Sequence, residues 1–511
     1  MEKRGGGKGK RLETGALLLA AAIFFTVSCG IAQLRLLWYD EIFTRQVVLL
    51  GSWSRIVTAL GHLMDLQPPL FYFLTAQVSN LGGEEIGLRL PAIVGFTCAG
   101  FSLYVIARRW FSPGYAMSAA LTPAIIFFSA LGVEARPYGL VLGCAAAALL
   151  GWTYRDRFPA AGRIGYLGGI LAAASVHDYG FMVAAPFAIA AAWTLWRRRR
   201  WDLWTILGCF CAVLPNLWNL GLIRESIGVY KNGAWNAPSW RALPTSLWGA
   251  CIAVLAAVIV LDLFFEPRAK DSSPGEQSPA GEAIACWIGF AALPIFVTVI
   301  AKVVSGLFML RYVSMFTLGY ALLLAYTLAG CAKGSRLVGY AVGCGALIAF
   351  ACIAAWNARD FAMERDMIAG SCDELATMFD QSEYRNSSLL MGDPHAALQL
   401  ALYCGDDVRQ RIVYGVDPGR QLAYIGSNTD SKGMLGLRAN SPIAIVPLEE
   451  FLRAQQHELV VFHDQRSYLK QYFSDRPEYA SRFHTVRAGE LAGVYRLDPA
   501  MASGSGGSGE K

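Results

Sequence analysis

The stretch LLWYDEIFTR, residues 36–45, places two adjacent carboxylates, Asp40 and Glu41, directly after a long apolar run. The run covers residues 12–34, and a helix that crosses a membrane needs about 20 such residues. The basic segment MEKRGGGKGKR stands before it and resembles the start of a signal peptide. The run is too long for a signal peptide, however, and no small-residue cleavage site precedes the acids. We therefore expect an uncleaved first span that ends at the two acids.

The rest of the chain is also rich in long apolar runs. Of the 511 residues, 55% are apolar and only 16% are charged, and the mean hydropathy is +0.39. This composition excludes an ordinary soluble domain and indicates an α-helical polytopic membrane protein. The net charge of +6 is modest, and the basic residues gather in short loops, which indicates membrane topology and no nucleic-acid partner.

The apolar runs predict about 11 transmembrane helices, within a range of about 11–13. We expect them near residues 14–34, 89–107, 114–132, 136–154, 163–177, 181–196, 203–223, 244–265, 283–302, 311–330 and 337–356. With the N-terminus in the cytoplasm, the inner side receives nearly every basic cluster, including the four arginines at 197–200. An odd number of spans then places the C-terminal part outside.

The segment PPLFYFLTAQVSNL, residues 68–81, is apolar but too short for an ordinary span. Counting it as a span would reverse the side of every later basic cluster. We therefore expect an interfacial or re-entrant helix within a first external loop, residues 35–88, of the transmembrane module 1–356.

The outward ends of the spans carry acids, arginines, histidines and tyrosines, whereas the inner loops carry basic residues with little pattern. Polar groups at membrane depth are costly unless they are paired or face a cavity. Several of them on one side indicate a shared, water-accessible site, although span ends, helix caps and snorkelling side chains explain each residue taken alone. Besides Asp40 and Glu41, the residues are His62, Asp65, Arg89, Glu134, Arg136, Tyr138, His177, Tyr179, Lys302, Arg311 and Tyr312.

The order of these motifs resembles a known family. DE after the first span is followed by DLQPPLFY, RLP, EARPY, HDYG and RY. This order is similar to that of the C-type integral-membrane glycosyltransferases, in the branch of the protein O-mannosyltransferases and the bacterial aminoarabinose transferase. The resemblance covers about residues 14–330. It departs from the family at DLQPPL, where a histidine often precedes the prolines, and at HDYG, where two tyrosines are common.

The resemblance implies inverting transfer of a sugar from a polyprenyl-phosphate donor, with no nucleotide sugar, at the outer face of a bacterial cytoplasmic membrane. Because phosphate is already a good leaving group, one carboxylate base is enough for an acceptor hydroxyl. By resemblance Asp40 is this base, and Glu41 orients the acceptor or Asp40. Which of the two is the base stays open, because both carboxylates stand at the same span end.

The implied reaction gives roles to the remaining outward residues, because a departing phosphate needs cationic partners. Cationic and phenolic side chains would bind the donor phosphate, with Arg311 first and Arg136, Lys302 and Tyr312 after it. The others would line the donor and acceptor pocket, namely His62, Asp65, Arg89, Glu134, Tyr138, His177 and Tyr179. We expect no certain cofactor, and a divalent metal stays open.

The sugar and the acceptor stay open. The acceptor could be lipid A, a cell-wall glycan, a polysaccharide or a protein hydroxyl. The alternative functions are a transporter of a lipid-linked or envelope precursor and a non-enzymatic envelope assembly factor. A transporter would place its charges nearer the middle of the membrane and in paired repeats, whereas here they gather at one face and no repeat is evident.

Residues 357–500 differ from the spans in their pattern of apolar and polar residues. The segments NSSLLMGDP, QRIVYGV and HELVVFHD are typical of short buried strands, and helical patterns flank them. We expect a soluble, external α/β domain with a largely parallel sheet, followed by a flexible tail at 501–511. An external domain meets an oxidising compartment, so a disulfide between Cys372 and Cys404 is expected, with two unrelated buried thiols as the alternative.

Overall fold

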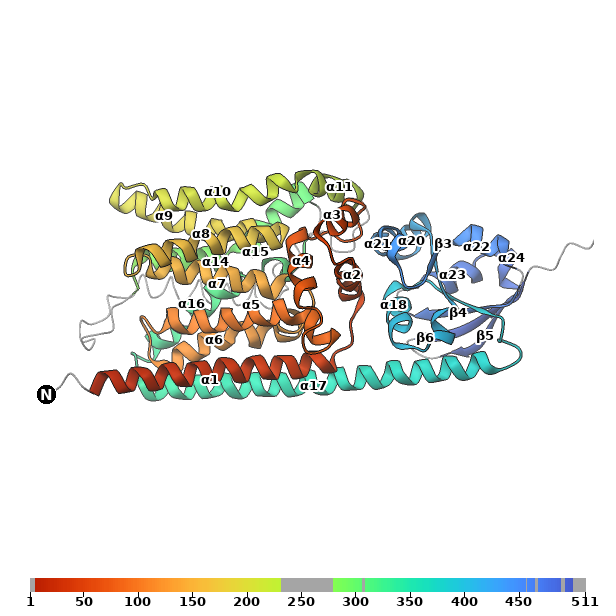
Figure 1. Cartoon of the computed structure of the whole chain (residues 1–511), viewed down its shortest axis with the longest axis horizontal. Helices are drawn as coiled ribbons and strands as arrows, with labels where there is room; N and C mark the ends of the chain where they lie inside the picture. Colours follow the sequence, from red (N-terminus) through yellow and green to blue (C-terminus); the bar gives the residue numbers. More distant parts are fainter. Residues whose placement is uncertain are drawn as a thin grey trace, which may run out of the picture.

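The computed structural model describes residues 5–230, 279–305, 308–455, 457–464, 467–488 and 492–499. Apolar helices form a bundle at one end of the molecule (Figure 1). Four described helices are long and apolar enough to cross a membrane, or up to six if each bent pair counts as one span. The bundle contains α1 (Gly5–Leu34), α5 (Glu84–Ala107), α6 (Pro113–Phe127), α7 (Tyr138–Tyr154), α8 (Pro159–Val176), α9 (Ala184–Arg198), α10 (Leu203–Trp218), α11 (Leu220–Tyr230), α14 (Gly281–Ala291), α15 (Leu293–Ile300) and α16 (Phe316–Cys331).

All the predicted spans but one overlap a helix of the bundle or α17. The exception, 244–265, lies outside the described residues. Small residues allow the helices to approach closely, which favours association in lipid. A Cβ atom on Gly95 of α5 would stand only 2.5 Å from the carbonyl oxygen of Gly139 on α7, and one on Gly143 would stand 2.5 Å from Gly95 O.

Three short helices lie between the bundle and the α/β part of the molecule (Figure 1). They are α2 (Tyr39–Val48), α3 (Trp53–Gly61) and α4 (Pro69–Val78). The segment expected to be interfacial or re-entrant contains α4, and Pro69 begins this helix because a proline at the first helical position loses no intrahelical hydrogen bond.

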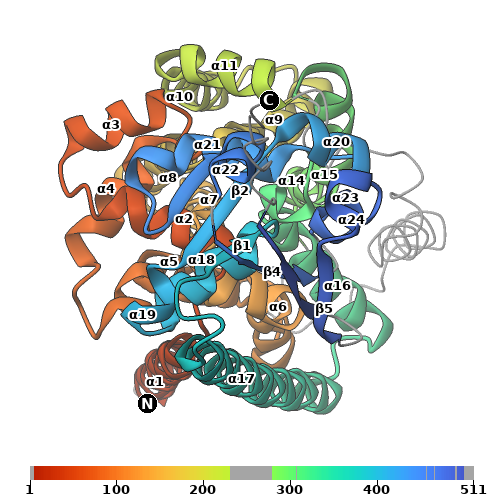
Figure 2. The same ribbon diagram turned by 90° about the vertical axis from the view of Figure 1, so that its right-hand side faces the viewer.

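The helix α17 (Arg336–Asp380) is 45 residues long. It runs beside α1 along one side of the bundle and then continues to the α/β part (Figures 1 and 2). The sequence pattern predicts a span that ends at 356 and a separate helical stretch near 372, and the boundary expected at 357 falls inside this helix. The charged segment that follows 356 ends the apolar pattern but contains no proline to end the helix.

A six-stranded sheet forms the α/β module, residues 388–497, which faces the viewer in Figure 2. Its strands follow the order β3-β2-β1-β4-β6-β5. The first four in this order are parallel, and β6 pairs antiparallel with both β4 and β5. The strands are β1 (Ser388–Met391), β2 (Ile412–Val416), β3 (Ala444–Pro447), β4 (Leu459–Asp464), β5 (Phe483–Ala488) and β6 (Ala492–Leu497).

The fold class predicted from the sequence is confirmed, a helical membrane bundle with a mainly parallel α/β module. The three expected strand segments contain β1, β2 and β4, whereas β3 and the antiparallel pair β5 and β6 were not expected. The helices of the module are α18 (Pro394–Tyr403), α19 (Asp406–Arg409), α20 (Pro418–Ile425), α21 (Thr429–Leu437), α22 (Leu448–Ala454), α23 (Leu469–Ser474) and α24 (Pro477–Ala480).

A disulfide joins the long helix to the module. Cys372 on α17 is bonded to Cys404, the residue that ends α18, and their Cα atoms are 5.1 Å apart. The bridge therefore fixes the C-terminal end of α18 to a helix that also belongs to the bundle.

Candidate active site

A cavity of about 580 Å³ lies between the bundle and the α/β module. Residues from both parts of the molecule line it. The bundle and the segment 38–67 contribute Trp38, Tyr39, Asp40, Phe43, Leu63, Met64, Asp65, Leu66, Gln67, Arg136, Tyr138, Met309, Arg311 and Tyr312, and the module contributes His395, Ile425, Ser427, Thr429, Asp430 and Gly433. Four of the charged candidates from the sequence, Asp40, Asp65, Arg136 and Arg311, therefore meet at one place.

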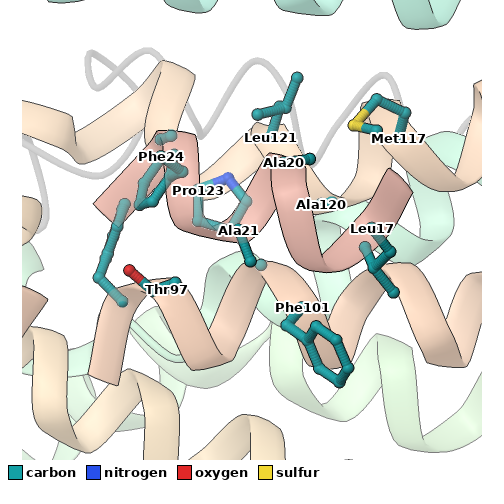
Figure 3. A pocket seen from close by; sticks show the side chains of 13 residues that line it. Leu17, Ala20, Ala21, Phe24, Thr97, Phe101, Met117, Ala120, Leu121 and Pro123 are labelled. Carbon is teal, nitrogen blue, oxygen red and sulfur yellow. The ribbon is translucent and has the colours of Figure 1, made fainter. Parts of the chain in front are cut away.

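A second pocket, of about 60 Å³, lies among α1, α5 and α6 (Figure 3). Its lining is apolar except for Thr97, whose Oγ1 donates to Ile93 O at 2.8 Å. This pocket presents no titratable side chain, so it offers no group for acid–base chemistry.

Asp40 lies in the first turn of α2 and lines the cavity. Its Oδ2 accepts a hydrogen bond of 2.7 Å from Arg311 Nη2. The short helix η4 (Leu310–Val313) carries Arg311, whose guanidinium lies over the rings of Trp38 and Tyr138 at 5.2 and 5.4 Å. The two aromatic rings thus hold the cation beside the carboxylate.

Arg136 forms the second cationic centre of the cavity. It pairs with Asp65, with Nη2 donating to Oδ1 at 3.3 Å, and its Nη1 donates to Thr44 Oγ1 at 3.1 Å and to Asp40 O at 3.3 Å. The Nε atoms of Arg136 and Arg311 are buried and have no hydrogen-bond partner in the part of the chain that the structure describes. Each arginine therefore has one buried N–H group that no described residue satisfies.

Two opposing effects set the ionisation of Asp40. Burial raises its pKa, and the nearby charges of Arg136 and Arg311 lower it. The two charges outweigh the burial, so the pKa lies below the ordinary value for aspartate. Asp40 is therefore ionised at neutral pH.

Glu134 behaves differently, since burial raises its pKa to about 7 in spite of the neighbouring Arg311. Its Oε1 accepts hydrogen bonds from Trp38 Nε1 at 3.2 Å and from Arg311 Nη1 at 3.4 Å. Glu134 therefore lies behind Arg311, outside the cavity lining.

The structure places Glu41 outside the cavity, which fits a role in orienting Asp40 and not the acceptor. Its carboxylate is fully buried and accepts two hydrogen bonds of 2.7 Å from the guanidinium of Arg89, which is also fully buried. A further bond of 2.6 Å comes from the backbone N–H of Ala135. Adjacent helical residues point about 100° apart, so Asp40 faces the cavity and Glu41 faces the protein interior. Neither Glu41 nor Arg89 lines the cavity, and their pair holds the segment beneath Asp40.

Two other expected residues also lie elsewhere. His62 ends α3 and is exposed, and Lys302 is exposed on the π-helix η3 (Ala301–Ser305); neither lines the cavity. A short apolar stretch separates Lys302 from Arg311 in the sequence, but of the two cations only Arg311 lines the cavity.

An aromatic cluster continues from the cavity wall. Tyr138 and Tyr312 line the cavity with ring centroids 6.0 Å apart, and Tyr179 stacks on Tyr312 at 5.6 Å. His177 packs against Tyr138 and Tyr312, and its Nδ1 accepts the backbone N–H of Tyr179 at 2.9 Å. His177 and Tyr179 therefore support the wall without lining the cavity.

Gln67 and His395 are two of the cavity residues that the sequence did not lead us to expect. Gln67 is only 8% exposed, and its Oε1 has no hydrogen-bond partner among the described residues. The sequence did mark this position, because Gln67 is the residue at which DLQPPL departs from the family pattern. The residues around His395 in the sequence give no indication of a site, because His395 reaches the cavity only through the docking of the α/β module.

No group of three or more His, Cys, Asp or Glu side chains able to hold a metal ion occurs within the described ranges. The cavity instead pairs two carboxylates with two guanidinium groups.

No protein-family profile matches the chain, and no curated protein matches it in sequence. Its structure is similar to that of ArnT from Cupriavidus metallidurans bound to undecaprenyl phosphate, with a TM-score of 0.55 and 12% identity over 94% of this chain and 98% of that one. For the apo state of the same protein the TM-score is 0.51 and the identity 15%, over 95% and 98% of the two chains. The chain therefore has the fold of ArnT, a C-type integral-membrane glycosyltransferase, as the order of its sequence motifs predicts.

Proposed function

We propose that this protein transfers a sugar from a polyprenyl-phosphate donor to an acceptor hydroxyl, with inversion, at the outer face of the cytoplasmic membrane. One observation carries the proposal, the contact of Asp40 with Arg311 in a cavity that also contains Arg136. A base and cations for a phosphate are the two components that this reaction requires. The undecaprenyl phosphate bound to the structural neighbour supports a lipid phosphate as donor.

In this mechanism the acceptor oxygen attacks the anomeric carbon from the face opposite to the phosphate. The bond between the anomeric carbon and the phosphate oxygen breaks, and the polyprenyl phosphate leaves with the electron pair. Asp40 takes the proton of the acceptor hydroxyl, a contribution of about 10²–10⁴-fold to the rate. Arg311 and Arg136 stabilise the charge that develops on the phosphate.

The ion pair between Asp40 and Arg311 also couples donor binding to base strength. In the free protein Arg311 lowers the pKa of Asp40 and makes it a weak base. A bound phosphate would compete for the guanidinium and weaken this effect. Asp40 would then become more basic only after the donor has entered, which limits unproductive proton transfer.

The direct test uses purified protein in lipid nanodiscs and polyprenyl-phosphate sugar with a radiolabelled sugar. Transfer to an extract of envelope glycans, glycolipids and proteins is expected, together with release of polyprenyl phosphate. Movement of intact donor across the bilayer without release would instead show a transporter, and neither event would show an assembly factor. Mass spectrometry of envelope glycans from a deletion strain would then identify the acceptor.

A further inference from the structure

The residues that immediately precede Asp40 are held by one helix of the α/β module, α18. The backbone N–H of Leu37 donates to Tyr403 Oη at 2.7 Å, and Gln399 Nε2 donates to Leu37 O at 3.4 Å. The ring of His395 stacks on Tyr39 with centroids 4.3 Å apart and planes 26° apart. Three turns of α18 thus contact the segment that leads into the proposed base.

The contacts continue to Arg311 through Trp38. The Trp38 ring packs beside His395, with centroids 6.2 Å apart, and also beneath the guanidinium of Arg311. Its Nε1 donates to Glu134, which also accepts from Arg311. A movement of α18 would therefore disturb both members of the pair between Asp40 and Arg311.

The helix α18 is itself fixed at both ends. At its start, the side chain of Asp393 accepts the backbone N–H groups of His395 and Ala396, each at 3.1 Å, so His395 belongs to a capped first turn. At its end, Cys404 is bonded to Cys372 on α17. Because α17 also runs along one side of the bundle, the disulfide fixes α18 relative to the membrane part of the molecule.

Ordinary domain packing would place contacts anywhere on the outer surface of the bundle. Here the hydrogen bonds and ring contacts of α18, apart from those with α17, fall on Leu37, Trp38 and Tyr39, and His395 also lines the cavity. The backbone bond to Leu37 fixes the main chain, and the stacked ring fixes the side-chain direction. Together they restrict how far Asp40 can move.

We propose that α18 positions Asp40 for transfer, with His395 and Tyr403 as positioning residues that hold the segment 37–39 against Arg311. This inference rests on the proposed function for its effect on turnover. A misplacement of about 1 Å at a reacting group can cost about 10²-fold in rate. Loss of one contact should therefore lower turnover without removing the groups that bind the donor phosphate.

The test compares His395→Ala, which removes the ring, with His395→Phe, which keeps a ring for stacking, and uses His484→Ala on β5 as a matched histidine control. His395→Ala should lower kcat about tenfold with an unchanged KM for the donor, whereas His395→Phe should restore most of the lost kcat. Unchanged kcat in His395→Ala would overturn the proposal. An equal loss in His395→Phe would also overturn it, because a polar contact would then be the cause.

A second measurement does not depend on the proposed function. Tyr403→Phe removes only the hydrogen bond to Leu37 N and keeps the packing of the ring. Hydrogen–deuterium exchange of the peptide 36–44 should become faster in Tyr403→Phe and His395→Ala and stay unchanged in His484→Ala. Unchanged exchange in both α18 variants would overturn the positioning role. A wild-type protein without any transfer, but with faster exchange in these variants, would contradict the proposed function alone.

Discussion

Arg311 Nη2 donates a 2.7 Å hydrogen bond to Asp40 Oδ2, although 271 positions separate the two residues in the chain. The carboxylate and the guanidinium are each partly accessible, at 23% and 14% of their side-chain surface. A pair that served only stability would be expected deeper in the protein, as Glu41 and Arg89 are. The accessible pair is therefore the one that a substrate can separate.

We expect Asp40→Asn to abolish transfer and to leave folding and donor binding largely intact. The amide keeps the shape of the side chain but cannot take up a proton, so kcat should fall by about 10²–10⁴-fold. Turnover by the purified variant, beside its melting temperature and its affinity for polyprenyl phosphate, is the measurement. Near-normal turnover would rule out Asp40 as the base.

Glu41→Gln is the matched control for this experiment. Removing one charge of a buried pair leaves Arg89 uncompensated and typically costs about 3–5 kcal/mol. This variant should therefore lose thermal stability, whereas Asp40→Asn should not.

Arg311→Ala should weaken donor binding and turnover together, because the guanidinium contacts the phosphate in both the ground state and the transition state. Arg311→Lys should recover part of the binding, since it keeps the charge but loses the planar fork. Binding of a phosphodiester donor and single-turnover rates would measure the two effects. If only the KM for the acceptor changed, the phosphate role of Arg311 would be wrong.

Glu134 gives a pH dependence of defined sign. Burial raises its pKa to about 7, so the group is neutral below that pH and charged above it. A charged Glu134 competes with the donor phosphate for Arg311, and donor affinity should therefore fall as the pH rises through about 7. The sugar phosphodiester has no ionisation in this range, so the ligand itself does not contribute.

Glu134→Gln should remove this pH step and keep the affinity of the low-pH form throughout. The free energy of unfolding gives an independent check. A carboxyl whose pKa is raised on folding stabilises the folded state less as the pH rises from the unfolded value, near 4.5, to about 7. The wild type should lose stability over this window, and the variant should lose less. Persistence of the affinity step in Glu134→Gln would show that another group titrates.

The sequence alone was sufficient to predict that Asp40, Arg136 and Arg311 share a site, because basic clusters fix the topology and the three residues fall on one side. The family resemblance also implied different roles for Asp40 and Glu41. The partner of Glu41 could not be predicted, since Arg89 reads as an ordinary span-end anchor until α2 and α5 are packed. His395 depends entirely on the docking of α18 onto the segment 37–39.

Gln67 offers a prediction with opposite signs for stability and binding. A buried carbonyl without a partner costs about 1–3 kcal/mol, so replacing Gln67 with Leu should leave the free protein as stable or more stable. If a substrate hydroxyl or amine donates to this amide in the complex, the same change should weaken substrate binding. Melting temperature and the KM for donor and acceptor are the measurements. Unchanged KM values would mean that Gln67 only fills space.

The disulfide provides the last prediction. Cys372 and Cys404 are 32 positions apart, and closing a loop of this size stabilises the folded state by roughly 3–4 kcal/mol in the chain-entropy model. Cys372→Ser should therefore lower the melting temperature, whereas Cys331→Ser, which removes an exposed free thiol, should leave it unchanged.

The same bridge tests on which side of the membrane the α/β module lies. Disulfides persist in oxidising compartments and are rare in the cytosol, so protein isolated from cells with its thiols blocked should already contain the bond. Labelling of the unfolded chain should then detect two more thiols after reduction than before it. Equal labelling in both conditions would contradict the bridge. It would also weaken the proposal that α18 is fixed to α17 and the placement of the module at the outer face, because both depend on an oxidised pair.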